Sequence, residues 1–79
     1  MFKKKFQIVN LTDLNSFKEN FVVTQEELIK AGIIKTDKIQ VKILGGGEIS
    51  KSLTVKANAF SAGAAEKIQK AGGKAEIVK

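Results

Sequence analysis

The chain has 79 residues, enough for one small hydrophobic core, and a formal net charge of +6 that arises from 14 lysines and 8 acidic residues. It contains no cysteine and no histidine, which excludes disulfides, thiol nucleophiles, the usual soft metal ligands and near-neutral proton shuttles, and with them most enzyme mechanisms. No stretch has the length of a membrane span or the apolar run of a secretory signal. We therefore expect a single-domain cytoplasmic protein that uses no cofactor, metal or small-molecule substrate.

The first residues predict a basic, disordered N-terminus at 1–5, with the sequence MFKKK, followed by one globular domain at 6–79. Apolar residues at 6–11 predict a short strand. Leu14 and Phe17, three residues apart, predict one helical turn directly after it.

A helix start is predicted at Thr24, because Glu27 follows at the spacing of a capping box. The helix should cover 25–31, with Lys30 in its last turn and Gly32 as a left-handed stop.

Two strands are predicted in the middle of the chain, because apolar and polar residues alternate there with the period of a half-buried strand. Their apolar positions are Ile39, Val41 and Ile43 in one strand and Leu53, Val55 and Ala57 in the other.

The last third of the chain predicts a helix over 62–71, capped by Ser61 and ended by a glycine pair, and then a short strand over 75–78. The apolar face of this helix is built from Ala64, Ala65, Ile68 and Ala71. Lys-Ala-Gly occurs at 30–32 and again at 70–72, which suggests a degenerate tandem of strand and helix units. The predicted fold class is a small single-domain α/β protein.

The charge is unevenly distributed along the sequence. Residues 1–27 hold four lysines and four acids, whereas residues 28–79 hold ten lysines and four acids, so the whole excess lies in the second part. This pattern indicates a polyanionic partner, with nucleic acid first and an acidic membrane surface second. A merely soluble lysine-rich surface explains the charge about equally well. The chain has no arginine, so we expect phosphate contacts by point charges rather than recognition of base sequence.

The glycine loop, Gly45-Gly46-Gly47, and the segment after it resemble a phosphate-binding loop but have Ser50-Lys51-Ser52 where that motif needs glycine, lysine and serine. That motif must also open a helix, and the residues that follow predict a strand, so nucleotide hydrolysis is disfavoured. Two interpretations remain. The loop is a flexible turn, or its missing side chains let an RNA backbone approach closely, with Lys51 nearby.

Several other residues are candidate phosphate contacts. Ser61 opens a helix without bulky residues, whose free amides favour an anion, although close packing of that helix is the more ordinary explanation. The candidate lysines are Lys3, Lys4, Lys5, Lys42, Lys51, Lys56, Lys67, Lys70 and Lys74. Lys67 and Lys70 are expected to share one helix face, which in most proteins is only a solvated face.

Two further residue types are assigned to ordinary structural roles. Phenylalanines can stack on RNA bases, but Phe6, Phe17, Phe21 and Phe60 lie in apolar patterns and are predicted to belong to the core. The scattered carboxylates lack an apolar pocket or a partner and are predicted to be solvated. They are Asp13, Glu19, Asp37 and Glu48.

The order of these features resembles the C-terminal signature of the large-subunit ribosomal protein L-fifteen family. That signature has a lysine and two apolar residues before a glycine loop, an alternating apolar pair, Phe-Ser, and then an alanine, an isoleucine and a glycine spaced by four. In this chain these positions are Lys42, Ile43, Leu44, Leu53, Val55, Phe60, Ser61, Ala64, Ile68 and Gly72. The segments FQIVNLTDLNSF and VVTQEELIKAGII also look like the family, so the resemblance covers nearly all of residues 6–79.

The resemblance implies an irregular strand-strand-helix superhelix. It also implies a structural, non-enzymatic constituent of the large ribosomal subunit that binds ribosomal RNA, contacts neighbouring ribosomal proteins and supports subunit assembly. Family members carry a long basic extension before this region, where this sequence has only MFKKK. The alternative function is a protein-interaction or scaffold domain whose basic face keeps it soluble.

Overall fold

The computed structural model describes residues 6–36 and 38–78. Its elements follow the chain in the order β1 (Phe6–Asn10), η1, a 3-10 helix (Leu11–Ser16), β2 (Val22–Val23), α1 (Gln25–Lys30), β3 (Gln40–Leu44), β4 (Thr54–Ala57), β5 (Ala59–Phe60), α2 (Ala62–Lys70) and β6 (Lys74–Ile77).

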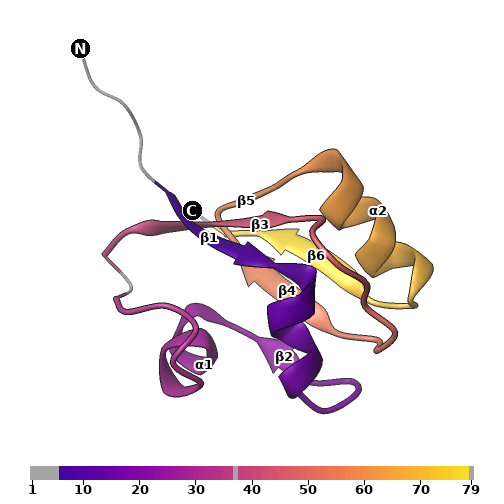
Figure 1. Cartoon of the computed structure of the whole chain (residues 1–79), viewed down its shortest axis with the longest axis horizontal. Helices are drawn as coiled ribbons and strands as arrows, with labels where there is room; N and C mark the ends of the chain where they lie inside the picture. The colour runs from indigo at the N-terminus through magenta and orange to yellow at the C-terminus, as the bar shows by residue number, and fades with distance from the viewer. Residues whose placement is uncertain (1–5, 37, 79) are drawn as a thin grey trace.

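The strands form two three-stranded parallel sheets, with the orders β1-β3-β5 and β2-β4-β6. Alternate strands therefore enter alternate sheets, and the chain winds through three turns that each add one strand to both sheets (Figure 1). The first turn crosses between the sheets through η1, the second through the glycine loop and the third through α2. This topology confirms the predicted α/β class and the superhelix, although the second turn has no helix.

The core fills the space between the two sheets. Parallel pairing places Val9 beside Ile43 and Val23 beside Val55, and all four are completely buried. Leu11, Leu14 and Leu28 from the helices and Leu53 and Ile68 from the second and third turns are completely buried as well. No polar or charged residue among those described is buried, so the stability rests on apolar packing.

The predicted helix caps are confirmed, although each helix ends one residue earlier than predicted, at Lys30 and Lys70. The Thr24 and Ser61 hydroxyls accept hydrogen bonds from the third residue of their helices, at 3.4 Å and 3.2 Å. Both Lys-Ala-Gly segments are left-handed C-terminal caps, since Gly32 and Gly72 have φ angles of +76° and +86°. In each cap the residue after the glycine donates to the carbonyl five residues before it, as in a Schellman motif. The repeat in the sequence thus marks two equivalent helix stops.

Two predicted core positions are wrong. Ile39 precedes β3 and is 42% exposed, and Phe6 lies outside the core cluster on the opposite face of β1 from Val9. Phe17 does belong to the core and stacks on Phe21, with ring centroids 5.4 Å apart. Phe21 and Phe60 pack against the core while partly exposed.

None of the helices in the described part of the chain combines the length and the apolar character needed to cross a membrane.

Candidate functional site

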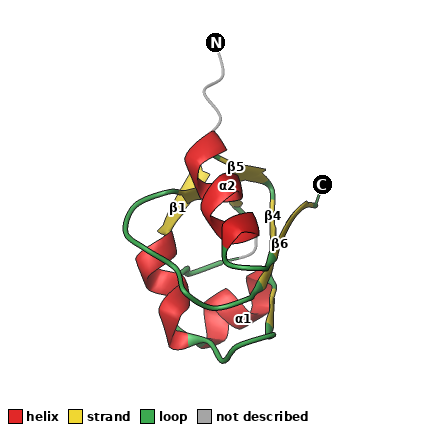
Figure 2. Cartoon of the chain, turned by 90° about the vertical axis from the view of Figure 1, so that its right-hand side faces the viewer, coloured by secondary structure: helices red, strands yellow, loops and turns green. Residues whose placement is uncertain are grey.

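The glycine loop lies between the start of η1 and the start of α2, on the side of the molecule seen in Figure 2. The Thr12 backbone amide donates to the Gly46 carbonyl at 3.2 Å, which joins the loop to the start of η1. Because β3 ends at Leu44 and β4 begins only at Thr54, the loop carbonyls have no hydrogen-bond donor in a sheet. They need donors from elsewhere in the chain.

Each glycine of the loop is required by a neighbour within the chain. A Cβ at Gly45 would lie 3.1 Å from the Ala64 backbone nitrogen, and a Cβ at Gly46 would lie 2.5 Å from the Asn10 side-chain oxygen. Gly47 has a φ angle of +85°, and a Cβ there would overlap the Thr12 side chain. Internal packing therefore accounts for all three missing side chains, and the left-handed conformation falls at Gly47 alone.

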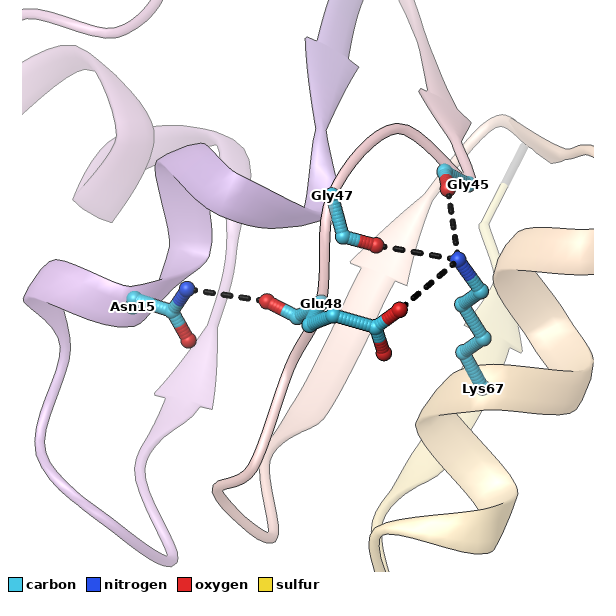
Figure 3. Close-up of polar contacts among 5 residues, drawn as sticks. All are labelled: Asn15, Gly45, Gly47, Glu48 and Lys67. Atoms are coloured by element: carbon cyan, nitrogen blue, oxygen red, sulfur yellow. Dashed lines mark hydrogen bonds and ion pairs between the residues drawn. The ribbon is translucent and has the colours of Figure 1, made fainter.

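Lys67 ties the loop to α2 (Figure 3). Its ammonium group donates to the carbonyls of Gly45 and Gly47 at 3.1 Å and 3.0 Å, and lies 3.7 Å from the Glu48 carboxylate. The Asn15 side-chain amide donates to the Glu48 carbonyl at 2.9 Å, so η1 holds the same loop from the other side. Lys67 and Lys70 share one helix face as predicted, since both line the hollow beside the loop, but the Lys67 ammonium group is held by the loop carbonyls rather than solvated.

Lys51 is also engaged within the chain. Its ammonium group donates to the Asn15 carbonyl and, at 2.8 Å, to the Phe17 carbonyl, at the C-terminal end of η1. The carbonyls that end a helix lack helical partners and carry partial negative charge, so a lysine stabilises them. Two of the three ammonium hydrogens of Lys51 are therefore already used within the chain.

The remaining candidate lysines are more accessible. Lys56 lies 3.7 Å from Glu76 and Lys70 lies 3.4 Å from Glu66, but both ion pairs are exposed and contribute only about 0 to 1 kcal/mol each. Lys74 is exposed at the start of β6. Lys3, Lys4 and Lys5 lie outside the described residues.

Lys42 lies on β3 with its ammonium nitrogen 5.8 Å from the centre of the Phe6 ring, within the range of a cation–π contact. Sequence reasoning assigned Lys42 to phosphate and Phe6 to the core, and so missed this pair. It also passed over Lys30, Lys35 and Lys38, which are exposed and form no ion pair or ammonium hydrogen bond within the described part of the chain. The sequence does contain a signal for them, because these lysines lie close together in a segment that has only one acidic residue.

Ser61 acts as the N-cap of α2, and the helix has no acidic residue in its first turn. By contrast, α1 has Glu26 and Glu27 in its first turn, where they would repel an anion. Ala62 and Gly63 are exposed next to the cap.

The segment that resembles a phosphate-binding loop lacks the required helix, because the residues after Ser52 enter β4. No group of three or more potential metal ligands occurs within residues 6–36 and 38–78. Beside the loop, Glu48, Ser50, Lys67 and Lys70 line a hollow of about 190 Å³ together with Ile49 and Ala71. Its acidic and basic groups leave little excess positive charge, which does not favour an anion.

Comparisons with known proteins agree with this architecture. The profile of a family of ribosomal proteins, whose description names 50S-L15 and 50S-L18e together with a 60S protein, matches residues 8–76. The large ribosomal subunit protein uL15 of Agathobacter rectalis is 56% identical over 70 residues, which cover 89% of this chain and 48% of that protein. The chain thus spans about half the length of that curated relative.

Proposed function

Because the chain belongs to the ribosomal protein family that includes 50S-L15 and 50S-L18e, we propose that it is a structural constituent of the large ribosomal subunit. In this proposal it works in the cytoplasmic ribosome, binds ribosomal RNA through contacts between lysines and phosphates, and lies next to other ribosomal proteins. It supports assembly of the subunit and catalyses no reaction.

The observation that carries the RNA-binding proposal is the number of ammonium groups that the fold leaves without an internal partner. Among the described residues, six lysines form no ion pair and donate no hydrogen bond from the ammonium group. They are Lys18, Lys30, Lys35, Lys38, Lys42 and Lys74. The proposal rests on the five that lie in the part of the sequence that carries the excess charge, and Lys18, in the neutral part, is excluded from it. Compact ammonium groups without such partners are suited to phosphates, which bind them by charge alone.

Lys56 and Lys70 join this group, since their exposed ion pairs are weak enough for a phosphate to replace the carboxylate. Lys51 and Lys67 contribute mainly by holding η1 and the glycine loop in place. Gly46 and Gly47 are exposed on the solvent side, so their backbone remains accessible to RNA. The uncapped amides beside Ser61 offer a further phosphate contact.

The proposal is tested by filter binding of large-subunit ribosomal RNA over a range of salt concentrations. We compare the parent chain with a triple variant, Lys56→Gln, Lys70→Gln and Lys74→Gln, and with Lys18→Gln as the control in the neutral part of the sequence. Each lost phosphate contact should reduce the slope of log affinity against log salt by roughly 0.7 to 0.9. The triple variant should therefore lose about 2 from the slope, whereas Lys18→Gln should retain the parent slope.

For the parent chain we expect a Kd of roughly 10⁻⁶ to 10⁻⁴ M near physiological salt, the range of non-specific electrostatic binding. An unchanged slope in the triple variant would contradict the lysine–phosphate contacts. Absence of any salt-dependent binding would instead favour the alternative of a protein-interaction domain with a solubilising basic face.

A further inference from the structure

The outer face of the β1-β3-β5 sheet has an unusual composition. Side chains alternate along each strand, and the buried positions Val9, Val41 and Ile43 point inward. Phe6 and Ile8 on β1 and Lys42 on β3 therefore point outward. Parallel pairing places Ile8 beside Lys42, and Ile8 keeps 49% of its surface exposed.

Phe6 has no structural role in the core. It is absent from the buried cluster and from the partly buried residues that pack against that cluster, and its close neighbour is the Lys42 ammonium group, 5.8 Å from the ring centre. Phe6 is half-buried on this face, and an aromatic ring at a sheet surface with a cation on one side has the character of a stacking platform.

The surroundings of Phe6 are basic. Neither β1 nor β3 contains an acidic residue, and the sequence from 30 to 42 holds four lysines and one acid, Asp37, which lies outside the described residues. The Gln7 side chain fixes this segment to β1, since its amide nitrogen donates to the Thr36 carbonyl at 2.6 Å and its oxygen accepts from the Lys35 amide at 3.2 Å. The backbone of the exposed Lys35 is thereby held at the same end of the sheet as Phe6, but from the opposite face of β1, on which the Gln7 side chain lies.

The outer face of the other sheet provides a contrast. There Lys56 lies beside Glu76 in register and forms an ion pair with it, and no aromatic residue is present in β2, β4 or β6. The combination of an aromatic ring with uncompensated positive charge is therefore specific to the β1-β3-β5 face.

We propose that this face is a stacking site for an unpaired RNA base, with the Phe6 ring as the platform and Ile8 as its apolar border. Lys42 contacts the phosphate of the stacked nucleotide. RNA fits this face by charge complementarity together with ring stacking, because a nucleotide supplies both a planar base and an anion within the reach of one lysine. This inference rests on the proposed RNA-binding function.

The chain contains no tryptophan and no tyrosine, so a single Phe6→Trp substitution provides an isolated fluorescent reporter on the platform. The matched control is Ile77→Trp, because Ile77 is 68% exposed on β6 of the other sheet. Both variants are titrated with single-stranded oligoadenylate and with an RNA duplex of equal length, and bound RNA is measured in parallel by filter retention.

We expect oligoadenylate to quench the tryptophan at position 6 and leave the one at position 77 unchanged, while the duplex, whose bases are already stacked, quenches neither. Phe6→Ala and Phe6→Leu should both lower affinity for oligoadenylate by at least about fivefold, the lower limit of loss of one base–aromatic stack, and should melt close to the parent temperature.

The outcomes separate the two proposals. Filter retention of RNA without quenching at position 6 would overturn the stacking site and leave the proposed function intact. Absence of retention for every RNA would overturn the proposed function itself. If Phe6→Leu binds oligoadenylate like the parent, the π surface of Phe6 does not contribute to binding and the stacking site is overturned.

Discussion

Replacement of Ile68 by alanine tests how far the last helix holds the two sheets together. Ile68 is completely buried on α2 and is part of the single core cluster. The substitution removes three carbon atoms, at about 0.8 kcal/mol each in transfer free energy, and leaves a cavity that raises the total loss to about 2 to 5 kcal/mol. A chain of this length has a free energy of unfolding of only about 4 to 12 kcal/mol.

Thermal denaturation followed by circular dichroism measures the effect. A loss of this size should lower Tm by more than about 8 °C, since each kcal/mol corresponds to roughly 4 to 8 °C in a small domain. Lys70→Ala, two residues further along the same helix and exposed, is the control and should melt near the parent. If Ile68→Ala melts within a degree of the parent, α2 does not contribute to the core as described, and the account of the third turn is wrong.

Two further predictions concern the glycine loop and its anchor. Gly47→Ala should destabilise the chain by at least about 1 kcal/mol in urea unfolding, because of its φ angle of +85°, whereas Gly63→Ala should be neutral or stabilising by up to about 1 kcal/mol, since open space surrounds that helical position. Lys67→Met should lower the unfolding free energy by about 1 kcal/mol through loss of two carbonyl contacts, while Lys70→Met should stay within about 0.5 kcal/mol of the parent. Equal effects at Lys67 and Lys70 would contradict the anchoring role.

The local elements could be predicted from the sequence because their signals are local. A capping residue and a glycine stop act within one helical turn, so Thr24, Ser61 and the two Lys-Ala-Gly segments define helix ends without reference to the rest of the chain. The strands around Val41 and Val55 could be predicted for the same reason, since one of their faces is clearly apolar and the other polar.

The inner face of β1 could not be predicted in this way. Phe6, Ile8 and Val9 place apolar residues on both faces of that strand, so alternation does not identify the inner one. The choice is made by pairing with β3, where Ile43 faces the core and brings Val9 inward with it. Phe6 consequently lies on the outer face of the sheet. Its prediction as a core residue was wrong because only the pairing with β3 determines which face of β1 is buried.

For the lysines, too, the position on a helix could be predicted from local spacing, whereas the groups they contact could not. Helical spacing correctly places Lys67 and Lys70 within one turn of each other, but it carries no information on what lies opposite. Opposite Lys67 are the carbonyls of Gly45 and Gly47, which have no partner in either sheet, and opposite Lys51 are carbonyls at the end of η1. Buried or half-buried carbonyls require a donor, so these two ammonium groups satisfy the backbone before they can meet any external anion.

This use of lysine limits how strongly the net charge can act on RNA. The formal charge of +6 counts every ammonium group equally, yet Lys51 and Lys67 are held by carbonyls, and Lys56 and Lys70 must exchange a carboxylate for a phosphate. Only contacts that release counterions from the RNA add to the salt dependence of binding. The slope of log affinity against log salt should therefore report only the lysines that contact phosphate, and it should be smaller than the number of lysines in the sequence would suggest.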